Sequence, residues 1–292
     1  MSGEATTPER RQLAFQTTSG FAELSYLVYE PPSARRTVFC LHDFLGNSAD
    51  FTRLARMMAA HGFRVVCPDL PGRGQSAYLA ATDYNPQTYL AALLTLVQSF
   101  GNIRLSIIAK GWGGLLALGL AQAPGIAVSR LVLSDLGFPW TVKVDDAVRQ
   151  AAEGPPLASL EEARRLLAES SEFKGVPLRH AATLIAGRLR QAEAEAGYRL
   201  DFDPVILSPE AIGKFGVVRT SPLFEGLKAK LLYLSSGKLR PKDRTRLQSV
   251  GGEGGNSMVV DNLARAEQVH FVTSHELLVT LGFMLSRYMP PV

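Results

Sequence analysis

The sequence predicts an α/β fold built on a mostly parallel sheet, because short apolar runs alternate with amphipathic stretches. Seven runs bounded by Gly, Pro and Asp have the length of buried strands: 22–29, 37–41, 64–67, 103–109, 130–134, 230–235 and 258–260. Four stretches between them have helical periodicity: 49–60, 86–100, 113–123 and 274–288. With 292 residues, of which 46% are hydrophobic and 20% charged, the chain suits one globular core with an insertion.

The alternation of strands and helices stops between residues 138 and 221. This segment is rich in Ala, Glu and Arg, as in LEEARRLLAESSEF at 160–173, and shows helical periodicity without a convincing strand. We therefore predict a helical cap at 138–221 inserted into a core formed by 1–137 and 222–292. Open α/β sheets bind ligands at the carboxyl ends of their strands, so a cap there would roof the site. A helical decoration remote from any site is the alternative.

Charge and composition exclude several classes of function. The net charge of +4 comes without a long Lys/Arg run, so we expect no nucleic-acid partner. Residues 1–11 are polar and no stretch approaches the ~20 apolar residues of a membrane span, which predicts a cytoplasmic protein without membrane contact. Cys40 and Cys67 are expected to be buried free thiols rather than a disulfide. The five histidines lack metal-ligand spacing and no nucleotide fingerprint is present, so we expect neither metal nor cofactor.

Five segments in order carry a family resemblance. They are LHDFLGNSADF at 41–51, CPDLPGRGQS at 67–76, IIAKGWGGLLAL at 107–118, LVLSDLGF at 131–138 and GYRLDFDPVI at 197–206. As an ordered set they resemble the α/β-hydrolase superfamily, in particular its cap-bearing small-molecule esterases and hydrolases. The resemblance implies an eight-stranded, mostly parallel sheet flanked by helices, with the cap over the active site.

The nucleophile elbow of this family departs from its pattern. The motif G-x-S-x-G exposes a serine on a strained turn between a strand and a helix. Laid on this sequence it covers 109–113 and puts Gly111 at the nucleophile position, without a hydroxyl. Glycine tolerates the strained backbone, so the resemblance implies an elbow whose geometry is kept. Lys110 and Cys40 are poor replacements, because we expect Lys110 to point away or be solvated and Cys40 to lie in the core.

The family's base position is kept in this sequence, whereas its usual acid position is not. The resemblance places the catalytic histidine at His270, in AEQVHFVTSHE at 266–276. The usual acid position falls in the stretch 238–240, which reads Lys-Leu-Arg. Asp243 follows too late and is expected to begin a helix. Asp135 is the candidate for orienting His270, with a role in shaping the loop into the cap as the alternative.

The oxyanion loop departs as well. After His42, where the family carries glycine, this chain has Asp43, which puts a carboxylate where negative charge would develop. Phe44 and Trp112 are expected to floor a mostly apolar ligand pocket beneath the cap. For Trp112, simple packing between elbow and cap is the alternative.

These departures favour one hypothesis and leave two open. Removing the nucleophile of a serine triad lowers turnover by on the order of 10⁶-fold, because the triad acts as a unit. We therefore expect a non-hydrolytic pseudoenzyme that binds a small apolar ligand or a protein partner. The first alternative is a serine-independent lyase, cyclase or general-base hydrolase that uses His42, Asp43 and His270. The second is a Ser-to-Gly variant of an esterase or C–C hydrolase.

Overall fold

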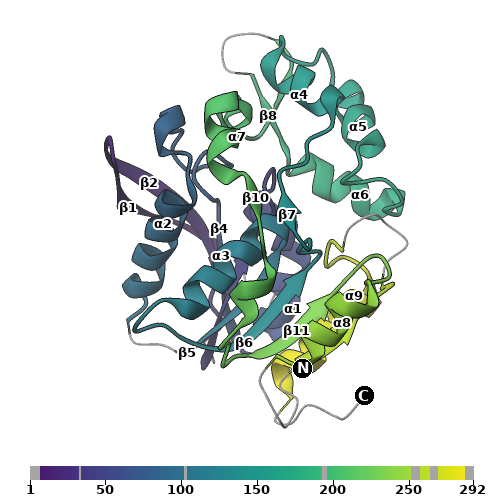
Figure 1. The fold of residues 1–292 in the computed structure, drawn as a ribbon. Helices are drawn as coiled ribbons and strands as arrows, with labels where there is room; N and C mark the ends of the chain where they lie inside the picture. Colours follow the sequence, from purple (N-terminus) through teal and green to yellow (C-terminus); the bar gives the residue numbers. More distant parts are fainter. Residues whose placement is uncertain are drawn as a thin grey trace.

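An eight-stranded sheet runs through the molecule (Figure 1). The computed structural model describes residues 7–32, 34–101, 104–192, 196–250, 257–263 and 269–286. The strand order is β1-β2-β4-β3-β5-β6-β11-β12. The strands are β1 (Glu9–Thr17), β2 (Gly20–Tyr29), β3 (Arg36–Leu41), β4 (Phe63–Pro68), β5 (Arg104–Lys110), β6 (Ala127–Ser134), β11 (Lys230–Leu234) and β12 (Ser257–Val260). Pairing is antiparallel at β1–β2 and β2–β4 and parallel elsewhere, which confirms the predicted sheet.

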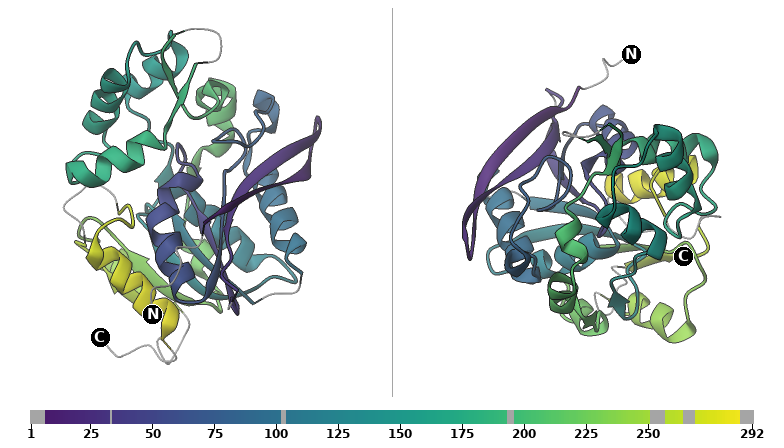
Figure 2. Two further views of the ribbon diagram at one scale, coloured as in Figure 1. Left: turned by 180° about the vertical axis from the view of Figure 1, so that it is seen from behind. Right: turned by 90° about the horizontal axis from the view of Figure 1, so that it is seen from above.

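Helices cover both faces of the sheet (Figures 1 and 2). One face packs against α2 (Pro86–Ser99) and α3 (Gly111–Gln122), and the other against α1 (Thr52–Ala60) and α9 (Ser274–Leu285). Central strands such as β3 and β5 are buried at every residue after the first, as expected for parallel strands with helices on both sides. The predicted helices are confirmed, with the first beginning as the 3-10 turn Ser48–Phe51. Residues 287–288 of the last predicted helix, like residue 103 of a predicted strand, lie outside the described residues.

The first strand of the sheet was not predicted. β1 forms a long antiparallel hairpin with β2 at the edge of the sheet, visible in both views of Figure 2. Its sequence ERRQLAFQT buries only Phe15 fully, and most of its other side chains are polar. An edge strand with so little apolar burial leaves no hydrophobic run to recognise.

The segment 138–221 contains helices and four very short strands. The helices are α4 (Asp146–Glu153), α5 (Leu160–Glu169), α6 (Leu178–Ala186) and α7 (Pro209–Phe215), with 3-10 turns at Pro204–Leu207 and Ser221–Phe224. The strands are β7 (Trp140–Thr141) paired with β10 (Val217–Val218), and β8 (Leu189–Gln191) paired with β9 (Tyr198–Leu200). The expectation of no strand is therefore wrong, because strands of two or three residues are too short to leave a periodic pattern.

Helices α4 to α6 stand over the carboxyl ends of the strands (Figure 1). α8 (Pro241–Gln248) follows β11 and has Asp243 in its first turn, as predicted. Cys40 and Cys67 are buried free thiols on the neighbouring strands β3 and β4. Among the described residues no helix has the length and apolar character needed to cross a membrane.

Candidate active site

The turn between β5 and α3 has the geometry of a nucleophile elbow. β5 ends at Lys110, and α3 begins at Gly111 with a φ of +47°, in the left-handed region that favours glycine. Gly113 allows the helix to pass close to the end of β3, since a Cβ there would lie 2.4 Å from the carbonyl oxygen of Leu41. The backbone that presents a nucleophile is therefore in place at this edge of the sheet.

The space beside Gly111 is filled by the carboxylate of Asp43. A Cβ at position 111 would lie 2.1 Å from Asp43 Oδ1 and 2.4 Å from its Cγ. These separations are far below van der Waals contact. No side chain fits at Gly111 unless Asp43 moves, so the two residues are sterically coupled across 68 positions of sequence.

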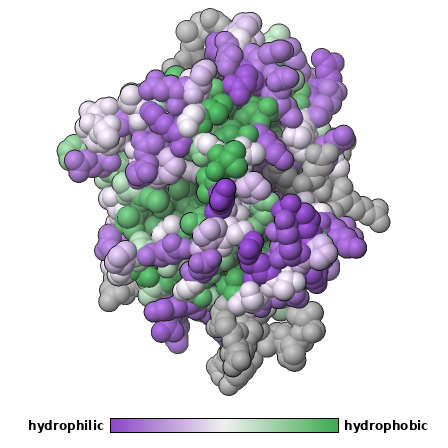
Figure 3. All heavy atoms as spheres, in the orientation of Figure 1, coloured by the Kyte–Doolittle hydropathy of each residue, from purple (hydrophilic) through white to green (hydrophobic). Residues whose placement is uncertain are grey.

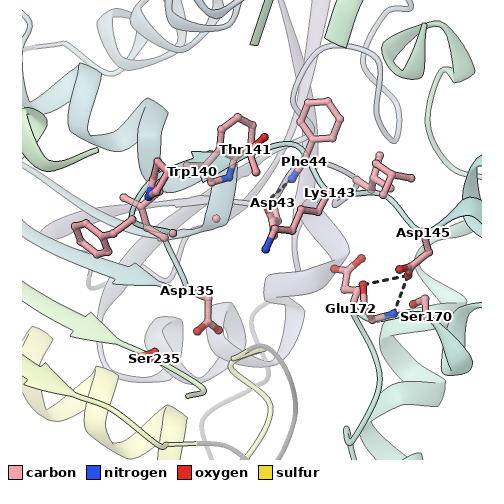
Figure 4. Close-up of a pocket in the computed structure, with 18 of the residues that line it drawn as sticks. Asp43, Phe44, Asp135, Trp140, Thr141, Lys143, Asp145, Ser170, Glu172 and Ser235 are labelled. Atoms are coloured by element: carbon pink, nitrogen blue, oxygen red, sulfur yellow. Dashed lines mark hydrogen bonds between the residues drawn. The ribbon is translucent and has the colours of Figure 1, made fainter. Parts of the chain in front are cut away.

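The same carboxylate accepts hydrogen bonds from two backbone amides. Asp43 Oδ1 lies 2.7 Å from the amide nitrogen of Phe44 (Figure 4) and 2.8 Å from that of Trp112. An amide following the nucleophile and an amide of the loop after β3 form the oxyanion hole of this type of elbow. Both donors are thus preorganised, and they hold a carboxylate oxygen of the chain itself. The second oxygen, Oδ2, has no hydrogen-bond partner among the described residues.

His42 and Arg73 fix the loop that carries Asp43. The buried His42 donates from Nδ1 to the carbonyl of Asp43 at 2.8 Å and accepts at Nε2 from the amide of Leu70 at 2.8 Å. Burial lowers the pKa of His42 well below its ordinary value, so the ring is neutral and both nitrogens are occupied. The buried Arg73 donates twice to the carbonyl of Phe44, at 2.9 and 2.7 Å. Arg73 lay in the quoted 67–76 motif, but its role was missed.

Both ring nitrogens of His270 have partners within the chain. Its ring stacks on Phe173 with centroids 5.3 Å apart, and Nε2 donates to the carbonyl of Glu172 at 2.8 Å. Nδ1 lies 3.2 Å from Lys110 Nζ. Because an ammonium group only donates, Nδ1 accepts and the proton sits on Nε2. Burial, followed by the charge of Lys110, lowers the pKa of His270 to about 3.

Asp135 contacts the backbone beside His270 rather than its ring. Its carboxylate accepts from the amide of Ser236 at 2.8 Å, from the Ser236 hydroxyl at 3.0 Å and from the amide of Val269. Burial raises the pKa of Asp135 above its ordinary value. The expected hydrogen bond between Asp135 and the His270 ring is not formed, since both ring nitrogens already have other partners.

A chain of buried charges joins the elbow to the 138–221 segment. Lys110 is only 2% exposed, so the expectation that it is solvated is wrong. Its Nζ lies 3.2 Å from Glu172 Oε1, which is also 2.8 Å from Arg188 Nη2. Arg188 in turn pairs with both oxygens of Asp50 at 2.7 and 2.8 Å. Although burial opposes it, the pKa of Glu172 is lowered because Arg188 and Lys110 stabilise its charged form.

A cavity of about 640 Å³ opens between the strand ends and the 138–221 segment (Figure 4). Asp43, Phe44, Gly111 and Asp135 are among its lining residues, whereas His42, Trp112 and His270 are not. The expected role of Phe44 as part of the pocket wall agrees with its position. Trp112 instead packs against Trp140 and Phe215, at centroid distances of 4.9 and 5.0 Å, which is the alternative considered for it.

The lining of the cavity is more charged than expected. Apolar side chains such as Leu136, Phe138 and Leu200 share it with nine charged residues: Asp43, Asp135, Lys143, Asp145, Glu172, Arg188, Lys238, Arg240 and Asp243. In the described part of the chain, no three His, Cys, Asp or Glu side chains come together as a metal site would require. Figure 3 shows apolar side chains gathered toward the middle and left of the face seen from the front, with hydrophilic side chains around them.

Comparison with known proteins agrees with this geometry. The family model of the α/β hydrolase fold matches residues 36–174. A 3-hydroxybutyrate-oligomer hydrolase of Cupriavidus necator is 32% identical over 120 residues, 41% of each chain. Lipase 1 of Psychrobacter immobilis is 29% identical over 128 residues, 42% of this chain and 39% of the lipase. The matches thus span about two-fifths of the length of these curated relatives.

Among solved structures the agreement extends over the whole chain. An α/β hydrolase from Novosphingobium aromaticivorans superposes with a TM-score of 0.78 at 26% identity, covering 98% of this chain and 100% of that one. The strand order, the elbow between β5 and α3 and the amide pair at Asp43 are the same features that define this fold. The chain has the α/β-hydrolase fold, and these similarities support the α/β-hydrolase superfamily as its family.

Proposed function

We propose that this protein is a non-hydrolytic member of the superfamily that binds a small molecule in the 640 Å³ cavity beneath the 138–221 segment. The observation that carries the proposal is the Asp43 carboxylate, which accepts from both oxyanion-type amides and fills the space next to Gly111. The Asp43 side chain thereby fills the space of the missing serine side chain. It also occupies the two amides that would stabilise the oxyanion of an ester intermediate.

Electrostatics supports this assignment. The oxyanion of an ester intermediate would have to approach the same two amides, within ~3 Å of a carboxylate oxygen. Two like charges at that distance repel by about 5 kcal/mol at an effective dielectric constant of ~20. That cost exceeds the few kcal/mol that one oxyanion donor contributes to lowering the barrier. Acyl transfer at this elbow is therefore disfavoured even before the missing hydroxyl is considered.

The state of His270 supports the proposal independently. A general base must accept a proton from a group in the cavity. His270 does not line the cavity, and its accepting nitrogen faces Lys110. The ring would have to leave both Lys110 and Glu172 before it could serve as a base.

The cavity indicates the kind of ligand. Leu136, Phe138 and Leu200 can cover an apolar body, and the charged lining residues can orient polar groups at its ends. The hydrolase and lipase names of the curated relatives describe those proteins, and only the ancestry of the scaffold is carried over here. If the cavity binds no small molecule, the remaining role in this proposal is to bind a protein partner.

Native mass spectrometry of the purified full chain tests the proposal. We expect an adduct of small-molecule mass that is lost in Val144→Trp, which fills the cavity, and kept in Val217→Trp, on an exposed strand that does not line it. A parallel assay with short p-nitrophenyl esters should show no turnover. Absence of an adduct together with ester turnover by the unmodified chain would contradict the proposal.

The second carboxylate oxygen of Asp43, Oδ2, favours a second candidate function. Asp43 lines the cavity, and its Oδ2 has no hydrogen-bond partner among the described residues. A carboxylate held through one oxygen could act as a general base through the other. Of the three residues considered for serine-independent catalysis, only Asp43 fits, because both nitrogens of His42 and of His270 are engaged. Turnover of p-nitrophenyl acetate that disappears in Asp43→Asn would favour this candidate over the first.

A further inference from the structure

A second cavity lies at the other end of the central strands, where the strands begin. Its volume is about 500 Å³, and five arginines line it: Arg35, Arg36, Arg64, Arg104 and Arg130. Arg36 begins β3 and Arg104 begins β5. Strand pairing sets Thr37 beside Arg64 and Ser106 beside Arg130. The register of four neighbouring strands thus gathers arginines that are far apart in sequence.

The positive charge of this arginine cavity is largely uncompensated. None of the described residues that line it is acidic. Arg64 pairs with Glu30 outside the lining, with Nε 2.6 Å from Oε1. The side chains of Arg35 and Arg104 lie on exposed residues and have no hydrogen bond or ion pair with any described residue, although the Arg35 amide donates to the carbonyl of Gly62. Among the residues that the structure describes, the five guanidinium groups thus have one carboxylate partner, that of Glu30, which Arg11 shares.

The carboxyl end of α9 accounts for part of the cluster. Arg36 donates to the carbonyl of Met284 at 3.3 Å, and Arg130 donates to the carbonyl of Ser286. Cations are favourable at a helix carboxyl end, so these two residues also have a structural role. Yet Nε of Arg130 is buried without an acceptor among the described residues. Burial and the charge of Arg36 lower the pKa of Arg130, as expected for a guanidinium that lacks a counter-ion.

We propose that the arginine cavity binds a multiply charged phosphate group, with pyrophosphate as its minimal form. Guanidinium forks match phosphate oxygens with paired hydrogen bonds, and several of them together call for more than one negative charge. Ser106 and Ser129 lie on the same wall, with their hydroxyl oxygens 3.2 Å apart and the Ser129 hydroxyl donating to the carbonyl of Leu105 at 3.1 Å. The site is independent of the Asp43 cavity, because it lies at the other end of β5 from Gly111.

Isothermal titration calorimetry of the full chain tests this site. Pyrophosphate, ADP, inorganic phosphate and sulfate are titrated at one ionic strength. We expect a single pyrophosphate site roughly tenfold tighter than phosphate or sulfate, since pyrophosphate carries more charge and more oxygens that accept charge-assisted hydrogen bonds. Binding of ADP as tight as pyrophosphate would place the group in a nucleotide, and weaker binding of ADP would indicate the free anion.

Arg35→Gln/Arg104→Gln is the test variant, because neither side chain has a described contact that the fold depends on. We expect it to weaken pyrophosphate binding roughly tenfold or more. Arg164→Gln/Arg165→Gln removes the same charge from exposed positions of α5 and should bind like the unmodified chain. Equal weakening in both variants, no pyrophosphate binding, or equal binding of all four anions would overturn the proposal.

Discussion

At the elbow the backbone keeps its geometry and the side chains differ, whereas at His270 the side chain is kept and its partners differ. Gly111 has the strained turn, and the amides of Phe44 and Trp112 point to one oxygen, which belongs to Asp43. His270 meets Lys110 and Glu172 instead of a nucleophile and an acid. The comparison teaches that a site can depart from its family in two ways: here Asp43 fills the space at the elbow, and other groups engage the histidine ring.

The largest effect is expected when a side chain is returned to the elbow. Gly111→Ser places a Cβ 2.1 Å from Asp43 Oδ1 on a backbone with φ +47°. Overpacking and the left-handed backbone should lower the free energy of unfolding by about 3 kcal/mol. Urea denaturation measures the loss.

Asp43→Gly in the same chain removes the collision, so the double variant should regain about 2 kcal/mol relative to Gly111→Ser alone. Asp43→Gly by itself completes the cycle as the control. A Gly111→Ser form as stable as the unmodified chain would show that Asp43 does not fill the elbow. We expect no ester hydrolysis by the double variant, because His270 remains engaged by Lys110 and Glu172.

A smaller effect is expected at the histidine end. Lys110→Met removes the charge that faces His270 Nδ1, while Glu172 keeps its bond to Arg188. The free energy of unfolding should fall by about 2 kcal/mol. This loss is smaller than that for a buried charge left without any partner, because Glu172 still pairs with Arg188. The pKa of His270, now about 3, should rise and can be followed by NMR. Lys214→Met, in a half-exposed pair with Glu210, is the control, and an unchanged His270 titration would contradict the assigned contact.

The pH dependence of stability gives a finer comparison. The pKa of His270 is about 3 when folded, against an ordinary value of 6.5, so unfolding takes up a proton between these limits. Stability is fully present above about pH 6.5 and is lost as the pH falls toward 3, by up to about 1.4 kcal/mol per pH unit for this group. His270→Gln should make the slope shallower by that amount. The same change at the exposed His275 is the matched control, and equal slopes in both variants would refute the prediction.

Much of the fold could be predicted from local sequence. Central strands such as β5 are continuous apolar runs, and glycines at 111 and 113 indicate a strand-to-helix turn. β1 escaped because an edge strand buries little. The short strands of 138–221 were not predicted, because two or three residues are too few to show an alternating hydrophobic pattern.

Some residues of the candidate site stood out in the sequence, but their contacts did not. Asp43 and Gly111 both stood out as departures, yet only the fold shows that one fills the space left by the other. Of the two positions considered for Lys110, the solvated one is wrong, because Lys110 is buried against Glu172, from a segment whose path the sequence does not reveal. The arginine cavity could not be predicted either, since the register between neighbouring strands brings its arginines together.

The amide protons of Phe44 and Trp112 test the central claim most directly. In ¹H–¹⁵N spectra of the full chain, both should lie downfield, as amides hydrogen-bonded to a carboxylate do. Asp43→Ala should move both upfield together, while the amide of Leu70, which donates to His42, serves as the internal reference. Two amide signals that stay in place when Asp43 is removed would contradict the account that its carboxylate occupies the oxyanion hole.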